Sequence, residues 1–532
     1  MWRQFKVPSS KFQESFVVNF VASFVEIAIG KAHAALSGSW EVASGQWLVA
    51  RNKMIVRSKT VTIAIPIAIT IKIKNMEVSM IQRMLLNGVM GACATVLITG
   101  CATAGRQVAL PEARPLGAQY PTAAQKIQPH KEAEQVPAVE LTGLIRLEEA
   151  LGSALLRNPT LDAFSYGVRA AEARVLQAGL LPNPELELSL EEVDRDGAGF
   201  DSAETAIVLG QVFELGGKHR WRTRVAEAEG ALAGWDYESK RLDVFTETAQ
   251  RFMAVLVAQE HVALAESAVE LAEKTSRAVD ERVKAGKEPP FQASKGEAEL
   301  DLARMEALGA QNALGVARKR LAAMWGAERV TFEGVAGSLD GVLRPLPALD
   351  TLRPRLSLNP DLARWETELR LRQAALASEK AARVPDVGVS VGYLKFEEDG
   401  TDAFVFGISV PLPIFNRNQG NIWAARHDLS RAHAEHMAAE LALSAELAET
   451  HAVLVGAHQR VTTLREKVVP AMEQAFGAAR EGYQQGKFGF LDMLDAQRGL
   501  FEAKGALVDA WSDYHTAVTA IQKMTGTRIG DR

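Results

Sequence analysis

Two carboxylates near the end of the chain, Asp492 and Asp495, have a spacing that could act on ions. They are three residues apart in a segment with helical periodicity, so both side chains lie on one side of a helix. If several copies of the chain met around an axis, the carboxylates would form a ring that attracts cations, repels anions and resists closure. The alternative is a pair of solvated helix carboxylates. Gln292 and Lys295 hold the corresponding places earlier in the chain, so only the later segment could supply such a ring.

Three histidines of one segment, His427, His433 and His436, raise the question of a metal site because histidines at i and i+3 can share a ligand face. Glu435 and Glu440 are near in sequence, but no fourth ligand is evident, so we expect a solvated helix face and no metal site. The sequence also contains no nucleophile elbow, phosphate loop or pair of catalytic carboxylates in a pocket-like context. We therefore expect no enzymatic activity and no cofactor.

Cysteine usage points to export. The chain has 532 residues and only two cysteines, Cys93 and Cys101, so no disulfide framework can stabilise its body. Residues 84–98 form an apolar run of about the length of a signal-peptide core, too short to span a bilayer as a helix. The run leads into Ile98-Thr99-Gly100-Cys101, which resembles a bacterial lipobox.

These features predict a lipoprotein signal peptide over residues 80–100 and lipid attachment at Cys101. The alternative is an ordinary signal peptide that is cut elsewhere. A Pro-, Gln- and Ala-rich composition predicts a linker over 101–141. Residues 1–79 precede a complete export signal, and we interpret them as an upstream extension from a misassigned start codon.

Bulk composition excludes two classes of protein. Apolar residues make up 47% of the chain, which excludes a disordered protein. The formal net charge is -5, so there is no electrostatic case for binding nucleic acid.

An internal repeat extends through most of the chain. Four landmarks recur at an offset of 200 or 201 residues, namely Asn158-Pro159 as Asn359-Pro360, Pro184 as Pro385, Gly286-Lys287 as Gly486-Lys487, and Met324 as Met524. This predicts two structural copies, over 142–326 and 350–526. An inter-repeat segment over 327–349 joins them, and 527–532 form a tail.

Each copy is expected to contain very long helices. No proline occurs from Lys218 to Val283, and only Pro470 interrupts the stretch from Gly420 to Gln485. Some 65 helical residues would extend about 100 Å, so these helices must form coiled coils or a tube.

Each copy is also expected to contain two short strands. Leu186, Leu188 and Leu190 alternate with polar residues, and residues 387–393 alternate between Val or Tyr and Gly or Ser. Their partners are predicted over 205–213 and 404–410. Such alternation fits a membrane barrel and an ordinary half-buried sheet equally well.

The number of strands favours the barrel. Four strands cannot close a barrel, and an open sheet in lipid would leave unpaired edges. Three chains would supply twelve strands and gather their long helices into a tube beneath. The expected fold is therefore mainly α with a membrane β-barrel portion, a trimeric 12-stranded barrel continuous with a periplasmic α-helical barrel.

Several local motifs resemble the TolC family of outer-membrane factors over about residues 140–526. The motifs are Pro182-Asn183-Pro184, Val410-Pro411-Leu412-Pro413-Ile414-Phe415, Gly482-Tyr483-Gln484-Gln485-Gly486-Lys487 and Leu491-Asp492-Met493-Leu494-Asp495-Ala496-Gln497. A further segment, Phe213 to Arg220, is similar to the CzcC-like branch that exports cobalt, zinc, cadmium or nickel. The glycines at 216 and 217 suit a strand-to-helix transition with unusual backbone angles.

The resemblance implies a passive, gated outer-membrane channel of a tripartite resistance-nodulation-division efflux system. It implies a homotrimer in outer-membrane lipid, a periplasmic adaptor, an inner-membrane pump and heavy-metal cargo. Drug or solvent efflux and type I protein secretion are alternative cargoes, and a periplasmic coiled-coil adaptor is the alternative without a pore. Family members have a periplasmic constriction at the positions of Asp492 and Asp495, and a latch at that of Tyr483. The latch's usual basic partner is replaced by Phe488, although Lys487 is adjacent.

Overall fold

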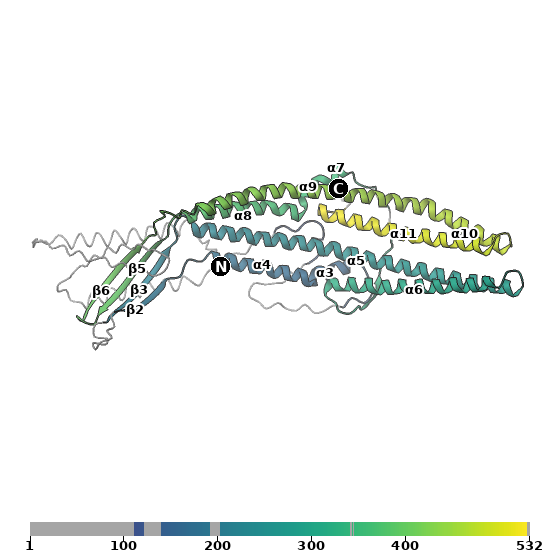
Figure 1. The fold of residues 1–532 in the computed structure, drawn as a ribbon, viewed down its shortest axis with the longest axis horizontal. Coiled ribbons are helices and arrows are strands. Elements are labelled where there is room, and N and C mark those ends of the chain that lie inside the picture. Colours follow the sequence, from purple (N-terminus) through teal and green to yellow (C-terminus); the bar gives the residue numbers. More distant parts are fainter. Residues whose placement is uncertain (1–110, 122–139, 192–202, 341–342, 344, 529–532) are drawn as a thin grey trace, which may run out of the picture. The chain divides into compact units, whose positions relative to one another are not determined.

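The computed structural model describes residues 111–121, 140–191, 203–340, 343 and 345–528 (Figure 1). The elements up to residue 335 are β1 (Gly143–Ile145), α3 (Leu147–Arg157), α4 (Pro159–Ala178), β2 (Glu185–Glu191), β3 (Glu204–Phe213), α5 (Lys218–Lys284), α6 (Phe291–Ala322), a short 3-10 turn and β4 (Phe332–Val335). Those that follow are α7 (Leu349–Leu352), a 3-10 turn, α8 (Pro360–Ala382), β5 (Val387–Phe396), β6 (Thr401–Ser409), α9 (Gln419–Thr463), α10 (Val469–Gln484) and α11 (Phe490–Thr525). The prediction of a mainly helical fold is confirmed.

Long helices dominate because the sequence has few residues that interrupt them. α5 contains 67 residues and α6 contains 32, and the two lie side by side (Figure 1). α9 pairs with α11 in the same way. At 1.5 Å per residue, α5 alone extends about 100 Å. The expectation of one uninterrupted helix over 218–283 is confirmed.

Pro470 perturbs the second long helix without ending it. Proline cannot donate an amide hydrogen bond, and its ring collides with the carbonyl four residues earlier. A five-residue π-helical turn, Leu464–Val468, directly precedes α10 and keeps the chain helical. The helix that the sequence predicts to Gln485 is therefore divided into α9 and α10.

The two hairpins end in turns of the same geometry. Gly286 and Gly486 have φ of 70° and 74°, which glycine adopts without strain. In both turns the amide of the following lysine donates to a carbonyl five residues back, at 2.9 and 2.8 Å. This is the Schellman pattern, which satisfies carbonyls at the end of a helix.

Two asparagines make matching contacts in the two halves of the chain. Asn158 and Asn359 each cap a helix that begins with proline. The amide of Asn158 also donates to the carbonyl of Met324 at 2.8 Å, and that of Asn359 donates to Met524 at 3.2 Å. Each cap therefore ties the start of a short helix to the end of the long helical hairpin.

Buried apolar side chains form two separate clusters. The larger cluster includes Phe245, Trp325 and Ile521 and joins the short helices to α5, α9 and α11. The smaller cluster, which includes Val279 and Phe490, lies near the hairpin turns. The hairpin ends thus have a small core of their own.

Residues 111–121, expected to belong to a linker, pack against α5. Leu116 is buried, and its amide donates to the carbonyl of Gly526 at 3.0 Å. Arg241 of α5 donates to the carbonyls of Arg114 and Leu116 at 3.2 and 3.0 Å. We call residues 111–121 the strap.

A second contact that the sequence did not suggest is a two-stranded parallel sheet of β1 and β4. The side-chain amide of Gln259 donates to the carbonyl of Val335, and its oxygen accepts from the Val335 amide at 2.7 Å. The short sheet is thereby fastened to α5.

Candidate functional site: sheet, junction and helical tip

One face of the four-stranded sheet is apolar and exposed. The strand order is β2-β3-β5-β6, with antiparallel pairing throughout. Two rows cross the sheet on this face, Leu186-Leu209-Val391-Phe406 and Leu188-Ile207-Tyr393-Phe404. Leu188, Phe406 and Ile408 are 69%, 76% and 78% exposed. A surface this apolar marks a contact with lipid or another protein.

The opposite face carries small and polar side chains together with two valines. The equivalent rows are Glu185-Gly210-Ser390-Gly407 and Glu187-Val208-Gly392-Val405. Such a face can line water while the other lies against an apolar medium. β2 and β6 have no strand partner on their outer edges among the described residues.

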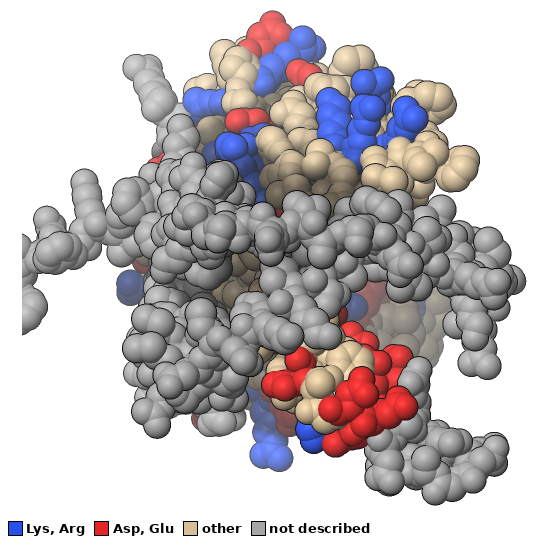
Figure 2. Space-filling model, turned by 90° about the vertical axis from the view of Figure 1, so that its left-hand side faces the viewer, with Lys and Arg blue, Asp and Glu red and all other residues tan. Residues whose placement is uncertain are grey.

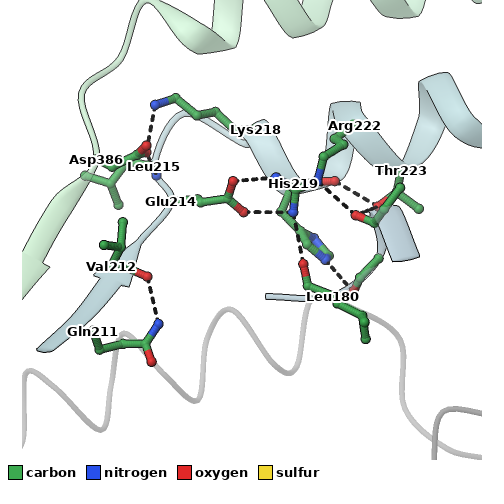
Figure 3. Close-up of polar contacts among 12 residues, drawn as sticks. Leu180, Gln211, Val212, Glu214, Leu215, Lys218, His219, Arg222, Thr223 and Asp386 are labelled. Carbon is green, nitrogen blue, oxygen red and sulfur yellow. Dashed lines mark hydrogen bonds and ion pairs between the residues drawn. The ribbon is translucent and has the colours of Figure 1, made fainter. Parts of the chain in front are cut away.

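A polar network joins the sheet to the helices (Figure 3). Arg222 forms a two-armed ion pair with Glu214. The same guanidinium donates to the carbonyls of Ala178 and Leu180 at 3.1 and 3.0 Å. The end of α4 and the start of α5 are therefore held together where the sheet passes into the helices.

A second ion pair of this network crosses between the halves of the chain. Asp386, just before β5, accepts from the ammonium of Lys218 at 2.7 Å and from the Leu215 amide at 3.1 Å. Gly216 and Gly217 between them have φ of 71° and 75°. The expectation that these glycines adopt unusual backbone angles at a strand-to-helix transition is confirmed.

Asp492 and Asp495 are both exposed on α11 next to the hairpin turn. Asp492 has a local role, since its carboxylate accepts from the Gly489 amide at 2.9 Å and caps the start of α11. Asp495 faces solvent within electrostatic range of Arg498. The structure therefore gathers both carboxylates at the tip and gives one of them a structural function.

Tyr483 is buried at the same tip. The guanidinium of Arg282 lies 4.8 Å from the centre of its ring, and burial raises the pKa of its hydroxyl. That hydroxyl has no hydrogen-bond partner among the described residues of this single chain. Phe488, at the place of the usual basic partner, packs directly onto Gly482.

Sequence reasoning missed a charged contact between the two hairpins. Arg498 of α11 forms an ion pair with Glu299 of α6, and the hydrogen bond raises the pKa of Arg498. The partners are 199 residues apart, close to the repeat offset. Comparing charges at that offset could have identified them.

The other candidate residues either belong to no metal-ligand group among the described residues or lie outside them. His436 stacks on Trp365 with ring centres 5.9 Å apart. No group of three or more metal-ligating side chains occurs among the described residues. Cys101 lies outside them.

A sheet with an exposed apolar face, carried on two long helical hairpins, is the architecture of an outer-membrane efflux channel. The chain belongs to the outer membrane efflux protein family, whose model matches residues 150–327 and 353–527.

Similarity to individual proteins agrees with this family assignment. Over 387 residues, 73% of this chain and 91% of the relative, the chain is 34% identical to the cobalt-zinc-cadmium resistance protein CzcC of Cupriavidus metallidurans. It is 26% identical over 300 residues, 55% of this chain and 68% of the relative, to the nickel-cobalt-cadmium resistance protein NccC of Alcaligenes xylosoxydans xylosoxydans. The solved structure of CusC, 16% identical, has a TM-score of 0.62 over 80% of this chain and 99% of its own. That structure supports the fold.

Proposed function

We propose that this protein is the outer-membrane duct of a tripartite efflux system that exports heavy-metal cations. The exposed apolar face of the four-stranded sheet carries the proposal, because it requires lipid on one side and tolerates water on the other. The similarity to the metal-resistance proteins CzcC and NccC supports metal cargo, as does the Phe213–Arg220 segment.

The duct is a homotrimer. Four strands leave two open edges, and exposed ladder groups are prohibitively unfavourable in a bilayer. Three chains close a 12-stranded barrel and extend it with their helical hairpins. The matching caps of Asn158 and Asn359 support two copies of one unit within each chain.

The tip is the gate. In a trimer, Asp492 and Asp495 form a carboxylate ring that favours cations, and Tyr483 joins the hairpins that must separate. Cys101 carries the lipid anchor at the outer membrane. An inner-membrane resistance-nodulation-division pump and a periplasmic adaptor supply the energy and the connection.

Cargo is tested by complementation. A strain that has a heavy-metal pump and adaptor but no outer-membrane component receives this gene. Accumulated cobalt, zinc and cadmium should fall to the level of the intact system. Unchanged metal content with restored export of dyes and bile salts would assign the duct to drug efflux instead.

Insertion is tested with two adjacent residues of β2. Leu188→Lys places a charge on the apolar face and should cost about 2–4 kcal/mol at mid-bilayer, whereas Ser189→Lys lies on the other face. Light scattering in detergent should return trimers for the wild type and for Ser189→Lys, with little membrane-inserted protein for Leu188→Lys. Equal insertion of both variants would contradict the barrel.

A further inference from the structure

The exposed apolar surface ends abruptly where the strands pass into the helices. After β6 it continues through Leu412 and Phe415, which are 74% and 89% exposed, and Arg417 follows two residues later. After β3 it continues to Leu215, and the charged start of α5 follows. A lipid-facing surface that turns cationic over a few residues is typical of a membrane–water interface.

Four arginines at this boundary have no ionic partner among the described residues. Arg220, Arg224, Arg383 and Arg417 are all exposed. Their neighbours Lys218 and Arg222 are already paired with Asp386 and Glu214. The Glu379 carboxylate, which accepts from the Asn418 side chain, also lies at this boundary, but the four arginines outnumber it. The junction therefore has excess positive charge, and we call these four residues the arginine collar.

Contacts between the segments hold the collar at one level of the molecule. The amide of Asn418 donates to the carbonyl of Glu379 at 2.8 Å, which places Arg417 beside the end of α8. Asp386 accepts from the Leu215 amide, which places Arg383 beside the start of α5. The arginines thus come from three segments that meet at the junction.

Helix stability does not explain the collar. Arg220 and Arg224 are like charges at i and i+4, and they lie near the start of α5, where the helix dipole disfavours cations. The first turn of α5 has no acidic residue to offset them. Both guanidiniums instead flank Trp221, at 5.7 and 4.9 Å from its ring centre. Tryptophan beside arginine is a usual combination at the headgroup level of a bilayer.

The opposite end of the sheet has the opposite charge. Acidic residues gather there on the ends of the strands and the β5–β6 turn, namely Glu191, Glu204, Glu397, Glu398, Asp399 and Asp402. Figure 2, which looks from the sheet end, shows a group of Asp and Glu side chains gathered at the lower right. The charge asymmetry gives the two membrane surfaces different electrostatic environments.

We propose that the arginine collar binds the phosphate headgroups of anionic phospholipids in the leaflet at the helical end of the sheet. The proposal rests on the membrane insertion argued above and adds a lipid class to it. Phospholipid is the occupant because the collar is continuous with the exposed apolar surface, so acyl chains and headgroup are both accommodated. A free phosphate would interact only with the arginines and would leave the apolar surface uncovered.

The test is tryptophan quenching in the full-length trimer, since Trp221 and Trp423 lie at the junction. The protein is reconstituted in phosphatidylcholine bilayers that contain increasing brominated phosphatidylglycerol, or brominated phosphatidylcholine for comparison. Each basic side chain near an anionic surface raises affinity roughly fivefold, and salt screening reduces this gain. We expect at least a roughly tenfold preference for phosphatidylglycerol, lost in 1 M salt and unaffected by millimolar inorganic phosphate.

Variants separate the collar from general surface charge. Changing all four collar arginines to Gln should abolish the preference, and changing them to Lys should retain most of it. The matched control changes four other exposed cations, Arg277, Arg329, Arg465 and Lys467, to Gln and should retain the preference.

Three results would overturn the proposal. If the inserted wild-type trimer is quenched equally by both brominated lipids, the collar binds no anionic lipid, although the duct itself stands. Competition by inorganic phosphate would assign the arginines to a free anion. Failure of the wild-type protein to insert at all would remove the proposed function and the collar together.

Discussion

Arg241→Met is expected to release the strap from α5. Arg241 is 1% exposed, and its guanidinium donates to Glu238 at 2.7 and 2.8 Å and to two carbonyls of the strap. Glu238 in turn accepts from the Arg114 amide at 2.6 Å. All hydrogen bonds from this buried ion pair to the strap involve backbone atoms of the strap.

The free-energy cost of Arg241→Met follows from the burial of the ion pair. The two side chains are only 2% and 4% exposed, so removal of the guanidinium leaves a buried carboxylate without its counter-ion. Breaking a buried pair in this way costs about 3–5 kcal/mol. If strap opening limits hydrogen exchange, this cost corresponds to an increase in the exchange rate of roughly two to three and a half orders of magnitude.

Hydrogen exchange at the Leu116 amide, which donates to Gly526, measures the effect. The double variant Glu238→Gln with Arg241→Met should recover much of the protection, because it removes the unpaired charge and keeps an acceptor for Arg114. Lys240→Met on the same helix breaks only a partly exposed 3.7 Å pair and should change exchange little. The reasoning would be refuted if Arg241→Met raised the exchange rate less than tenfold, or if the double variant exchanged as fast as the single one.

Three further predictions concern gating and pH. Asp492→Asn with Asp495→Asn should leave the trimer inserted but remove most of its cation preference and its block by periplasmic divalent ions in planar bilayers. Arg498→Glu should raise the open probability of single channels because its carboxylate would repel that of Glu299. Arg498→Glu with Glu299→Arg should return the open probability to the wild-type value. The exposed pair contributes about 0.2–1 kcal/mol per chain. Burial lowers the pKa of His515 below 6.5, so the unfolded chain binds the proton more readily, and the melting temperature should fall as pH drops through that value. His515→Gln should flatten this part of the acid dependence.

Both gating predictions have a control within the chain. Gln292→Ala with Lys295→Ala changes the matching positions of the first half and should alter ion selectivity much less. Lys504 and Glu473, 3.0 Å apart within one hairpin, should tolerate charge reversal without a change in gating. Full cation preference in the Asn variant would make Asp492 and Asp495 merely a cap and a solvated carboxylate. A charge swap that does not restore gating would show that the pair of Arg498 does not hold the hairpins together.

The sequence by itself determined the elements whose hydrogen bonds are local. The proline-free stretch from Lys218 predicts α5 because each helical bond closes within four residues, and alternation at Leu186 and Leu188 predicts β2 because side chains alternate across a strand. Gly286-Lys287 and Gly486-Lys487 predict the turns because few other residues adopt positive φ. The same local logic placed Asp492, Asp495 and Tyr483 next to one turn.

Only the tertiary structure decided which distant groups meet. The sequence could not show that the strap closes on Arg241, that Asp386 pairs with Lys218, or that Arg498 pairs with Glu299. The partners of these pairs are 125, 168 and 199 residues apart. No local pattern encodes such contacts, because they depend on the relative placement of helices that the chain reaches only by folding back on itself. For the same reason, Asp492 is recognisable as a helical carboxylate from its neighbours, whereas its place at a constriction depends on how separate chains come together.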